Sequence, residues 1–455
     1  MINELISQED LAMFTSAGRI TLGSIYFEEG MKDNLATFEV FIRPDEKRNY
    51  FVLAGINSLL DIMPKLKFNK EHLDFLKKVY NFSEGYLAYL GNLKFSGDIW
   101  AMPEGTICFP YEPLVRITAP LIQICLIEQL VINTIMHQTM LASKFARIRI
   151  ASKDKLVGTT LVRAHGMESS LKSVRISREV GIDISAMALY GMKNADFKAE
   201  GGVSTHFFVQ SFDTEIESFK AYFRHNAEKG IMLIDTYNYD TGIENFIKAA
   251  KESEINGRKV RGIIIDSGDH IEISKKVREK LDKAGLEYIK ILAMGNLDEY
   301  KITEFMEKKA PIDIFGVATE ALNCTDLPKL EVVFKMVELE KDGKFIPIIK
   351  LAQNKITYPG KKQVCIFHNA EGRIVARIIC REGEFKKSLL LKMVERGELV
   401  YKIPVTEDIK NYFFSQINSY PPLLFNLREK FEFPVLISEG LQDLFEQTKK
   451  KFLSK

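Results

Sequence analysis

The chain has 455 residues, of which 46% are hydrophobic and 27% charged, fractions typical of a water-soluble globular protein with two or three domains. Its formal net charge of +2 argues against a dedicated nucleic-acid surface but leaves the binding of anionic small molecules open. Its five cysteines are scattered, without the spacing of a zinc site or a disulfide framework, so we expect reduced thiols in a cytoplasmic protein.

No segment predicts a secretion signal or a membrane span. The first residues lack a basic leader before an apolar core. The most apolar stretch, 121–139, is interrupted by polar residues such as Glu128 and His137, which is typical of a buried helix. We therefore expect no membrane contact and no nucleic-acid partner.

The first part of the chain predicts a mixed α/β domain. Residues 36–42 alternate apolar and polar side chains, which favours a strand, and 50–56 form a second apolar run. A helix is expected over 70–79 and a further strand over 107–109. A long helix from about 120 to 145 would link this domain to the next.

From Arg147 onward, strand-like and helix-like segments alternate at intervals of roughly 30 residues, the repeat of βαβ units. Strands are predicted over 147–151, 160–164, 185–189, 204–209, 230–234, 262–265, 289–294, 312–316 and 332–337. Helices are predicted over 168–180, 215–226, 242–253, 270–284 and 298–309. Such repetition favours a parallel barrel over an open doubly wound sheet, although both remain open.

The last part of the chain returns to short strand-like pieces. They lie at 348–351, 363–367 and 373–379, and they could rejoin the sheet of the first domain. The tail, 405–455, carries two helical patterns and a lysine-rich end.

One stretch, Val260–Asp269, places two carboxylates at the end of a buried strand. Three consecutive isoleucines predict a strand that is buried on both faces, and Asp266-Ser-Gly-Asp269 follows it directly. In a parallel α/β sheet, the loops after the carboxyl ends of the strands form the functional edge. The two carboxylates could hold a metal ion or a pair of ribose hydroxyls, and Asp269 could equally be a plain helix N-cap.

Several motifs stand in an order that resembles the nicotinate phosphoribosyltransferase family of type II phosphoribosyltransferases, over about residues 10–400. They are Pro103-Glu-Gly-Thr106, Phe109–Pro120, Arg163-Ala-His-Gly166, Leu233-Ile-Asp-Thr-Tyr237, Asp266-Ser-Gly-Asp269, Asp313–Thr319 and Tyr358–Val364. The resemblance implies an α/β sandwich domain formed by 1–118 with about 340–400. It also implies a linking helix and an irregular parallel α/β barrel at 119–339, with a helical extension at 401–455.

The resemblance also implies an activity. The family joins nicotinate to phosphoribosyl pyrophosphate in NAD salvage, forming nicotinate mononucleotide and pyrophosphate. ATP hydrolysis with Mg²⁺ drives this reaction through a phosphorylated histidine. The enzymes are homodimers that share the site between subunits.

His206 matches the position of the phosphorylated histidine, and Asp235 matches the aspartate that orients it. From the residues alone, a histidine in an apolar run is more often a satisfied core residue. Phosphorylation on nitrogen needs a neutral imidazole whose tautomer is held by a partner.

Substrate contacts follow from the same resemblance and from the chemistry of the side chains. Arginine binds anions through two parallel hydrogen bonds, and the amides at strand ends suit a phosphate. The expected substrate-binding residues are Arg163, His165, Arg175, Asp183, Asp266, Gly295, Asn296, Gly316 and Thr319, and the expected metal ligands are Asp266 and Asp269.

The chain departs from the family pattern at several positions. Ser16 and Gly18 replace an aspartate and the tyrosine that stacks on the base, Val162 and Ile264 replace arginines, and Asn296 replaces an aspartate. A charge-assisted hydrogen bond contributes about 1.5–3 kcal/mol, so losing two arginines matters for affinity or rate. Two alternatives therefore stand beside the enzyme: a catalytically lapsed homologue that acts as a nucleotide-binding or regulatory dimer, and a phosphoribosyltransferase for a different base.

Overall fold

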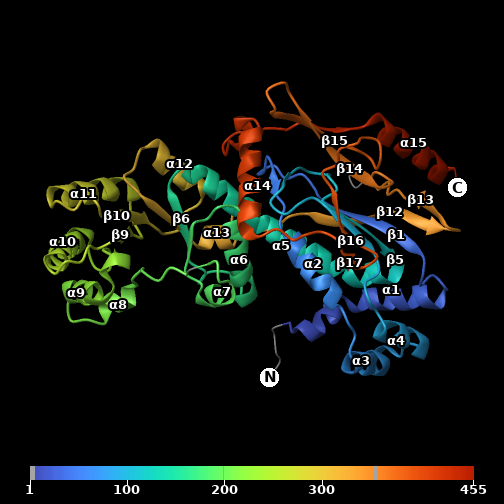
Figure 1. Cartoon of the computed structure of the whole chain (residues 1–455), viewed down its shortest axis with the longest axis horizontal. Helices are drawn as coiled ribbons and strands as arrows, with labels where there is room; N and C mark the ends of the chain where they lie inside the picture. The colour runs from blue at the N-terminus through green and yellow to red at the C-terminus, as the bar shows by residue number, and fades with distance from the viewer. Residues whose placement is uncertain (1–5, 198, 353–355, 455) are drawn as a thin grey trace. The chain divides into compact units, whose positions relative to one another are not determined.

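Figure 1 shows the computed structural model of the chain, which describes residues 6–197, 199–352 and 356–454. The chain divides into two compact units. The first is built from Met1–Ser143 and Lys329–Lys455, and the second from Lys144–Pro328. The segment that follows the second unit therefore returns to the N-terminal one. No helix within the described residues is long and apolar enough to cross a membrane.

The first unit is organised around an antiparallel sheet, in which the described residues form seven strands. The interior strand β1 (Leu35–Ile42) is largely buried, with the side chains of Ala36 and Val40 inaccessible to solvent. From edge to edge, the sheet contains β13 (Lys344–Pro347), β12 (Val332–Lys341), β1, β5 (Val115–Pro120), β3 (Asp98–Ala101), β16 (Leu391–Glu395) and β17 (Glu398–Leu399).

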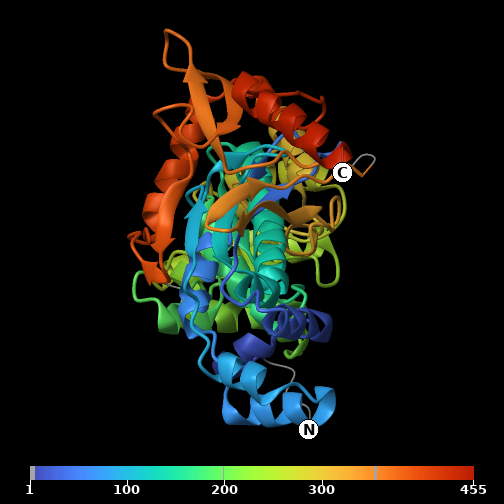
Figure 2. The same ribbon diagram turned by 90° about the vertical axis from the view of Figure 1, so that its right-hand side faces the viewer.

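Smaller sheets and several helices complete this unit. Figure 2 shows helix α3 (Lys70–Tyr80) beside α4 (Glu84–Gly91), and helix α15 (Glu439–Leu453) beside strand β15 (Ile374–Arg381). A fully buried ion pair between Arg377 and Glu112, at 2.9 Å, joins β15 to the loop before β5. The remaining elements are β2 (Phe51–Val52), β4 (Ile107–Cys108), β14 (Lys362–His368), β15 (Ile374–Arg381), β18 (Val435–Ile437), α1 (Ala17–Glu28), α2 (Ile56–Ile62), α3 (Lys70–Tyr80), α4 (Glu84–Gly91), α14 (Thr406–Ser419) and α15 (Glu439–Leu453).

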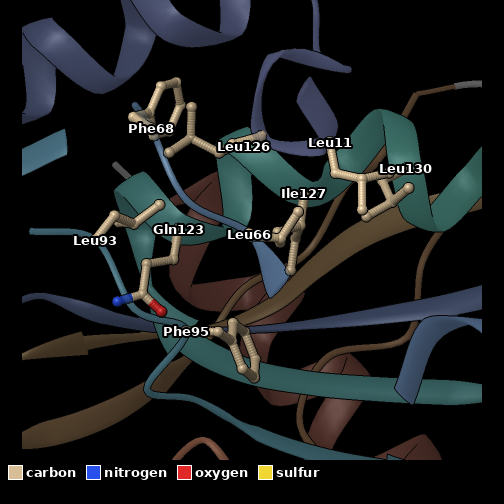
Figure 3. Close-up of a pocket in the computed structure, with 10 residues that line it drawn as sticks. Leu11, Leu66, Phe68, Leu93, Phe95, Gln123, Leu126, Ile127 and Leu130 are labelled. Atoms are coloured by element: carbon tan, nitrogen blue, oxygen red, sulfur yellow. The ribbon is translucent and has the colours of Figure 1, made fainter. Parts of the chain in front are cut away.

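A small apolar pocket lies beside the first half of helix α5 (Leu121–Ser152), as Figure 3 shows. Gln123 at its wall uses both ends of its amide. The side-chain oxygen accepts from the backbone N–H of Ser96 at 3.0 Å, and the side-chain nitrogen donates to the carbonyl of Lys94 at 3.2 Å. The pocket has a volume of about 10 Å³, room for one water molecule at most, so it is a packing gap rather than a ligand site.

The second unit contains a parallel sheet, in which the described residues form six strands. The isoleucines of strand β9 (Gly262–Ile265) explain the burial of this strand. Ile263 and Ile265 pack into the apolar layer beneath the helices, whereas Ile264 packs into a second cluster on the opposite face. From edge to edge, the strands are β7 (Ile184–Ser185), β6 (Leu156–Thr159), β11 (Ile314–Val317), β10 (Lys290–Ala293), β9 (Gly262–Ile265) and β8 (Ile231–Leu233).

Helices alternate with these strands, as the sequence predicted, and several of them are visible around β9 and β10 in Figure 1. The expectation of a parallel α/β unit combined with an α/β sandwich is confirmed. The strand pairs of the described residues leave β7 and β8 as edges, with one added parallel bridge from Val203 to Ile231, and do not close a ring. The helices are α6 (Met167–Glu179), α7 (Ala188–Lys193), α8 (His206–Gln210), α9 (Glu215–Asn226), α10 (Tyr239–Ile255), α11 (His270–Lys283), α12 (Glu299–Glu307) and α13 (Thr319–Leu322).

Two predicted strands are helical. Residues 147–151 belong to α5, where Lys144 and Arg147 lie one turn apart and both bind the buried carboxylate of Glu299. Residues 204–209 contain the start of α8, because the hydroxyl of Thr205 accepts the backbone N–H of Phe208 and caps the helix. In both segments, side-chain bonding prevails over a strand-like apolar pattern.

Other predicted strands are misplaced or shortened. The predicted strand 332–337 lies in the antiparallel β12 of the first unit, not in the parallel sheet. Strand β6 ends before 160–164, β7 covers only the first residue of 185–189, and 348–351 contains only an isolated bridge at Lys350. Strands β14 and β15 form a separate sheet with β18.

Candidate active site

Three polar side chains meet at the carboxyl ends of β8 and β9. His206, Asp235 and Asp266 each offer one potential ligand atom, and these atoms all lie within 4.8 Å of one another. Asp235 and Asp266 follow neighbouring parallel strands, so their positions at one edge of the sheet follow from the topology. His206 arrives from α8, just after the bridge between Val203 and Ile231.

Both ring nitrogens of His206 face polar atoms. Nδ1 lies 3.2 Å from Oγ1 of Thr236, and Nε2 lies 3.7 Å from Oδ2 of Asp266. In the tautomer with its proton on Nδ1, this nitrogen donates to Thr236 and the lone pair of Nε2 is free. Such an imidazole can act as a nucleophile or bind a cation, and Asp266 stabilises any positive charge that forms on it.

Asp235 is held by two donors on one oxygen. Its Oδ2 accepts from the hydroxyl of Ser267 at 3.0 Å and from that of Tyr239 at 3.2 Å. Its Oδ1 is buried and has no hydrogen-bond partner within the described residues. A buried acceptor without a partner costs about 1–3 kcal/mol, so this oxygen is available to accept a hydrogen bond or to bind a cation.

Asp269 caps helix α11. Its Oδ1 accepts the backbone N–H groups of Ile271 at 3.0 Å and Glu272 at 3.1 Å. The N-cap interpretation of this residue is confirmed. The group close enough to share an ion combines Asp266 with His206 and Asp235, and Asp269 is not part of it.

Gly295 follows β10 at a point where its backbone comes close to that of Asp266. Its φ is +91°, and a Cβ at this position would lie 2.0 Å from the carbonyl oxygen of Asp266. Only glycine therefore lets the two loops approach each other here. Asn296 also adopts a left-handed conformation, Gly316 lies within β11, and Thr319 begins α13.

The expected cationic contacts are not joined to this cluster by hydrogen bonds. Arg163 and His165 are exposed and make no hydrogen bond or ion pair with any described residue. Arg175 pairs with Glu179 within α6. Asp183 binds Arg149 at 2.9 Å. Their roles in substrate binding stay predictions.

Sequence reasoning missed Thr236, Tyr239 and Ser267. Thr236 lies within the motif Leu233-Ile-Asp-Thr-Tyr237. Its hydroxyl, directly after Asp235 in the sequence, was the one feature that could have indicated a partner for His206. Hydroxyls are frequent in loops after strands, so the pattern did not separate these three from ordinary turn residues.

Two features place this protein among the α/β proteins that carry a polar cluster at the carboxyl edge of a parallel sheet. It contains a parallel α/β unit, and a histidine and two aspartates gather at the carboxyl ends of its strands, where α/β enzymes carry their reactive groups.

Comparisons with known proteins narrow this class. Residues 13–136 match the model of the nicotinate phosphoribosyltransferase N-terminal domain. The chain is 33% identical over 447 residues to nicotinate phosphoribosyltransferase pncB2 of Mycobacterium tuberculosis, covering 96% of this chain and 93% of that enzyme. It is 30% identical over 474 residues to the nicotinate phosphoribosyltransferase of Bacillus subtilis, covering 96% and 95%.

Solved structures agree on the fold. The crystal structure of human nicotinic acid phosphoribosyltransferase matches with a TM-score of 0.82 at 20% identity, covering 95% of this chain and 99% of that one. The matches to the two bacterial enzymes and to the family model show that the chain belongs to the nicotinate phosphoribosyltransferase family.

Proposed function

We propose that this protein is a nicotinate phosphoribosyltransferase, which forms nicotinate mononucleotide and pyrophosphate from nicotinate and phosphoribosyl pyrophosphate. The observation that carries the proposal is the grouping of His206, Asp235 and Asp266 in a chain 33% identical to pncB2 over nearly its whole length. Such a reaction belongs to pyridine nucleotide salvage.

ATP enters the proposal through His206. With Nδ1 held by Thr236, the free lone pair of Nε2 attacks the terminal phosphorus of ATP, the bond to the bridging oxygen breaks, and ADP leaves. Asp266, 3.7 Å from Nε2, stabilises the positive charge that develops on the ring.

The site fits a magnesium ion. Mg²⁺ is usually held by one or two carboxylates together with the phosphates of a substrate. Oδ1 of Asp235 is without a partner in the described residues, and the side chain of Asp266 is 37% exposed, so both carboxylates can take part. Asp269 contributes less, since its Oδ1 already caps α11. When bound, the cation neutralises negative charge on the phosphates.

A homodimer is also part of the proposal. Several large apolar side chains in the loops and helices that follow strands of the second unit are exposed to solvent, and exposed apolar surface is typical of interaction sites. The exposed fractions are 85% for Val162, 69% for Met167, 76% for Met192, 71% for Phe207 and 65% for Tyr237. A second copy of the chain would cover them.

A different base is the second candidate. Ile264, which stands where the family pattern has an arginine, is fully buried in a cluster with Ile231, Leu233, Leu292 and Ile314. With isoleucine at this position, the cluster supplies no cation to a carboxylate, which favours a base without one.

Product formation tests both candidates. Purified protein is incubated with phosphoribosyl pyrophosphate and nicotinate, nicotinamide or quinolinate, each with and without ATP, and mononucleotide is measured. Nicotinate mononucleotide that increases with ATP supports the first candidate, and a product from another base supports the second. If no product forms with any base, both candidates fail, and the remaining hypothesis is a catalytically lapsed homologue.

A further inference from the structure

The hydroxyl of Tyr239 connects the ends of two neighbouring strands beside His206. It lies 3.2 Å from Oδ2 of Asp235, which follows β8, and 2.7 Å from the carbonyl oxygen of Ser267, which follows β9. The backbone N–H of Ser267 donates to the same hydroxyl at 3.2 Å. One phenol group therefore contacts both loops that carry the cluster.

The proton balance of this hydroxyl defines what it can do. It accepts one hydrogen bond from Ser267 and has a single proton to share between the carbonyl of Ser267 and the carboxylate of Asp235. The side chain of Ser267 adds a second donor on the same carboxylate oxygen. The contacts with Tyr239 and Ser267 thus fix Oδ2 in place. They also fix the rotation of the Asp235 carboxylate, in which Oδ1 has no partner among the described residues.

We propose that Tyr239 is a positioning residue, which holds Asp235 and the loop of Asp266 in register on either side of His206. Its effect on catalysis rests on the proposed function, whereas its effect on geometry does not. Without the phenol hydroxyl, Asp235 and the carbonyl of Ser267 lose the proton that they share, and the backbone N–H of Ser267 loses its acceptor on this ring. Asp266, the residue before Ser267, then loses its fixed distance from Nε2.

Anchoring of the helix does not require this hydroxyl. Helix α10 is capped by the side chain of Asn238, and Ile243 and Phe246 bury its inner face. Tyr288, just before the amino end of β10, offers a matched control, because its hydroxyl also donates to a carboxylate, that of Glu254 at 2.9 Å. The variants Tyr239→Phe and Tyr288→Phe remove the same atom at opposite ends of the sheet.

Steady-state kinetics give the first readout. We expect Tyr239→Phe to lower kcat about tenfold while KM for the base changes less than twofold, and Tyr288→Phe to change neither. Because Tyr239 acts partly through Asp235, adding Tyr239→Phe to an Asp235→Asn variant should lower kcat by clearly less than tenfold. Equal kcat in the two phenylalanine variants, or a full additional loss in the double variant, would overturn the proposal.

Nuclear magnetic resonance gives a readout that is independent of activity. The ring nitrogens of His206 are identified among the seven histidines by their absence in His206→Ala. At one fixed pH, we expect the chemical shifts of the His206 ring nitrogens to change in Tyr239→Phe and to remain the same in Tyr288→Phe. If the parent protein forms no product, this spectrum alone decides: unchanged His206 nitrogens in Tyr239→Phe refute the positioning role. A shift supports it even though the proposed function has failed.

Discussion

Nε2 of His206 lies 3.7 Å from Oδ2 of Asp266, although the histidine begins a short helix and the aspartate follows a strand. Their side chains are 43% and 37% exposed, so a substrate can reach both. The folded chain thus presents an imidazole nitrogen to solvent with a carboxylate beside it. This contact makes His206 the residue whose chemistry is most directly testable.

Incubation with γ-labelled ATP and Mg²⁺ should place an acid-labile phosphoryl group on the protein, and His206→Ala should abolish it. The substitution removes a half-exposed side chain rather than core volume, so the thermal unfolding curve should stay the same. His225→Ala, which changes an exposed histidine of the same unit, serves as the control and should keep the label. Retention of the label in His206→Ala would exclude the phosphohistidine role.

Thr236→Val should slow phosphorylation of the protein about tenfold, corresponding to about 1.4 kcal/mol. Valine has the shape of threonine but cannot bond to Nδ1, so the tautomer with a free Nε2 loses its support. Thr236→Ser keeps the hydroxyl and should retain most of the rate. The initial rate of label incorporation measures the effect, and equal rates for valine and serine would show that the bond has no role.

Lys144→Met should lower the free energy of unfolding by about 3–5 kcal/mol. Lys144 is buried and binds Glu299, whose side chain is inaccessible, at 2.5 Å, and Asp326 at 2.9 Å. Removing the cation leaves the buried carboxylate of Glu299 paired with Arg147, at 2.8 Å. Urea denaturation measures the change. The exposed pair of Lys172 and Glu168 provides the control, since Lys172→Met should cost less than about 1 kcal/mol.

The main features of the second unit were predictable because burial leaves a clear pattern. Three isoleucines in a row require apolar surroundings on both faces, and β9 has them. Parallel pairing then places Asp235 and Asp266 at one edge, so their proximity needed no further information.

Contacts made by single side chains were not predictable in the same way. The strand pattern of 147–151 did not reveal that Lys144 and Arg147 share Glu299, a residue far along the chain. The ion pair of Arg261 with Glu200, at 3.2 Å, likewise joins two residues that are far apart in the sequence.

Gly295→Ala should disrupt the site far more than an ordinary glycine substitution. Alanine is strained at a φ of +91°, and its Cβ would lie 2.0 Å from the carbonyl oxygen of Asp266, so the loop of Asp266 has to move. Gly257→Ala isolates the strain, because Gly257 has a φ of +75° and no atom within 4 Å of the added Cβ. Both variants should lose about 1 kcal/mol of stability from the backbone conformation alone.

Only Gly295→Ala should also lose His206 phosphorylation, by at least tenfold, because the position of Asp266 beside Nε2 depends on this loop. Equal labelling of the two variants would mean that the Asp266 loop adjusts without consequence for His206.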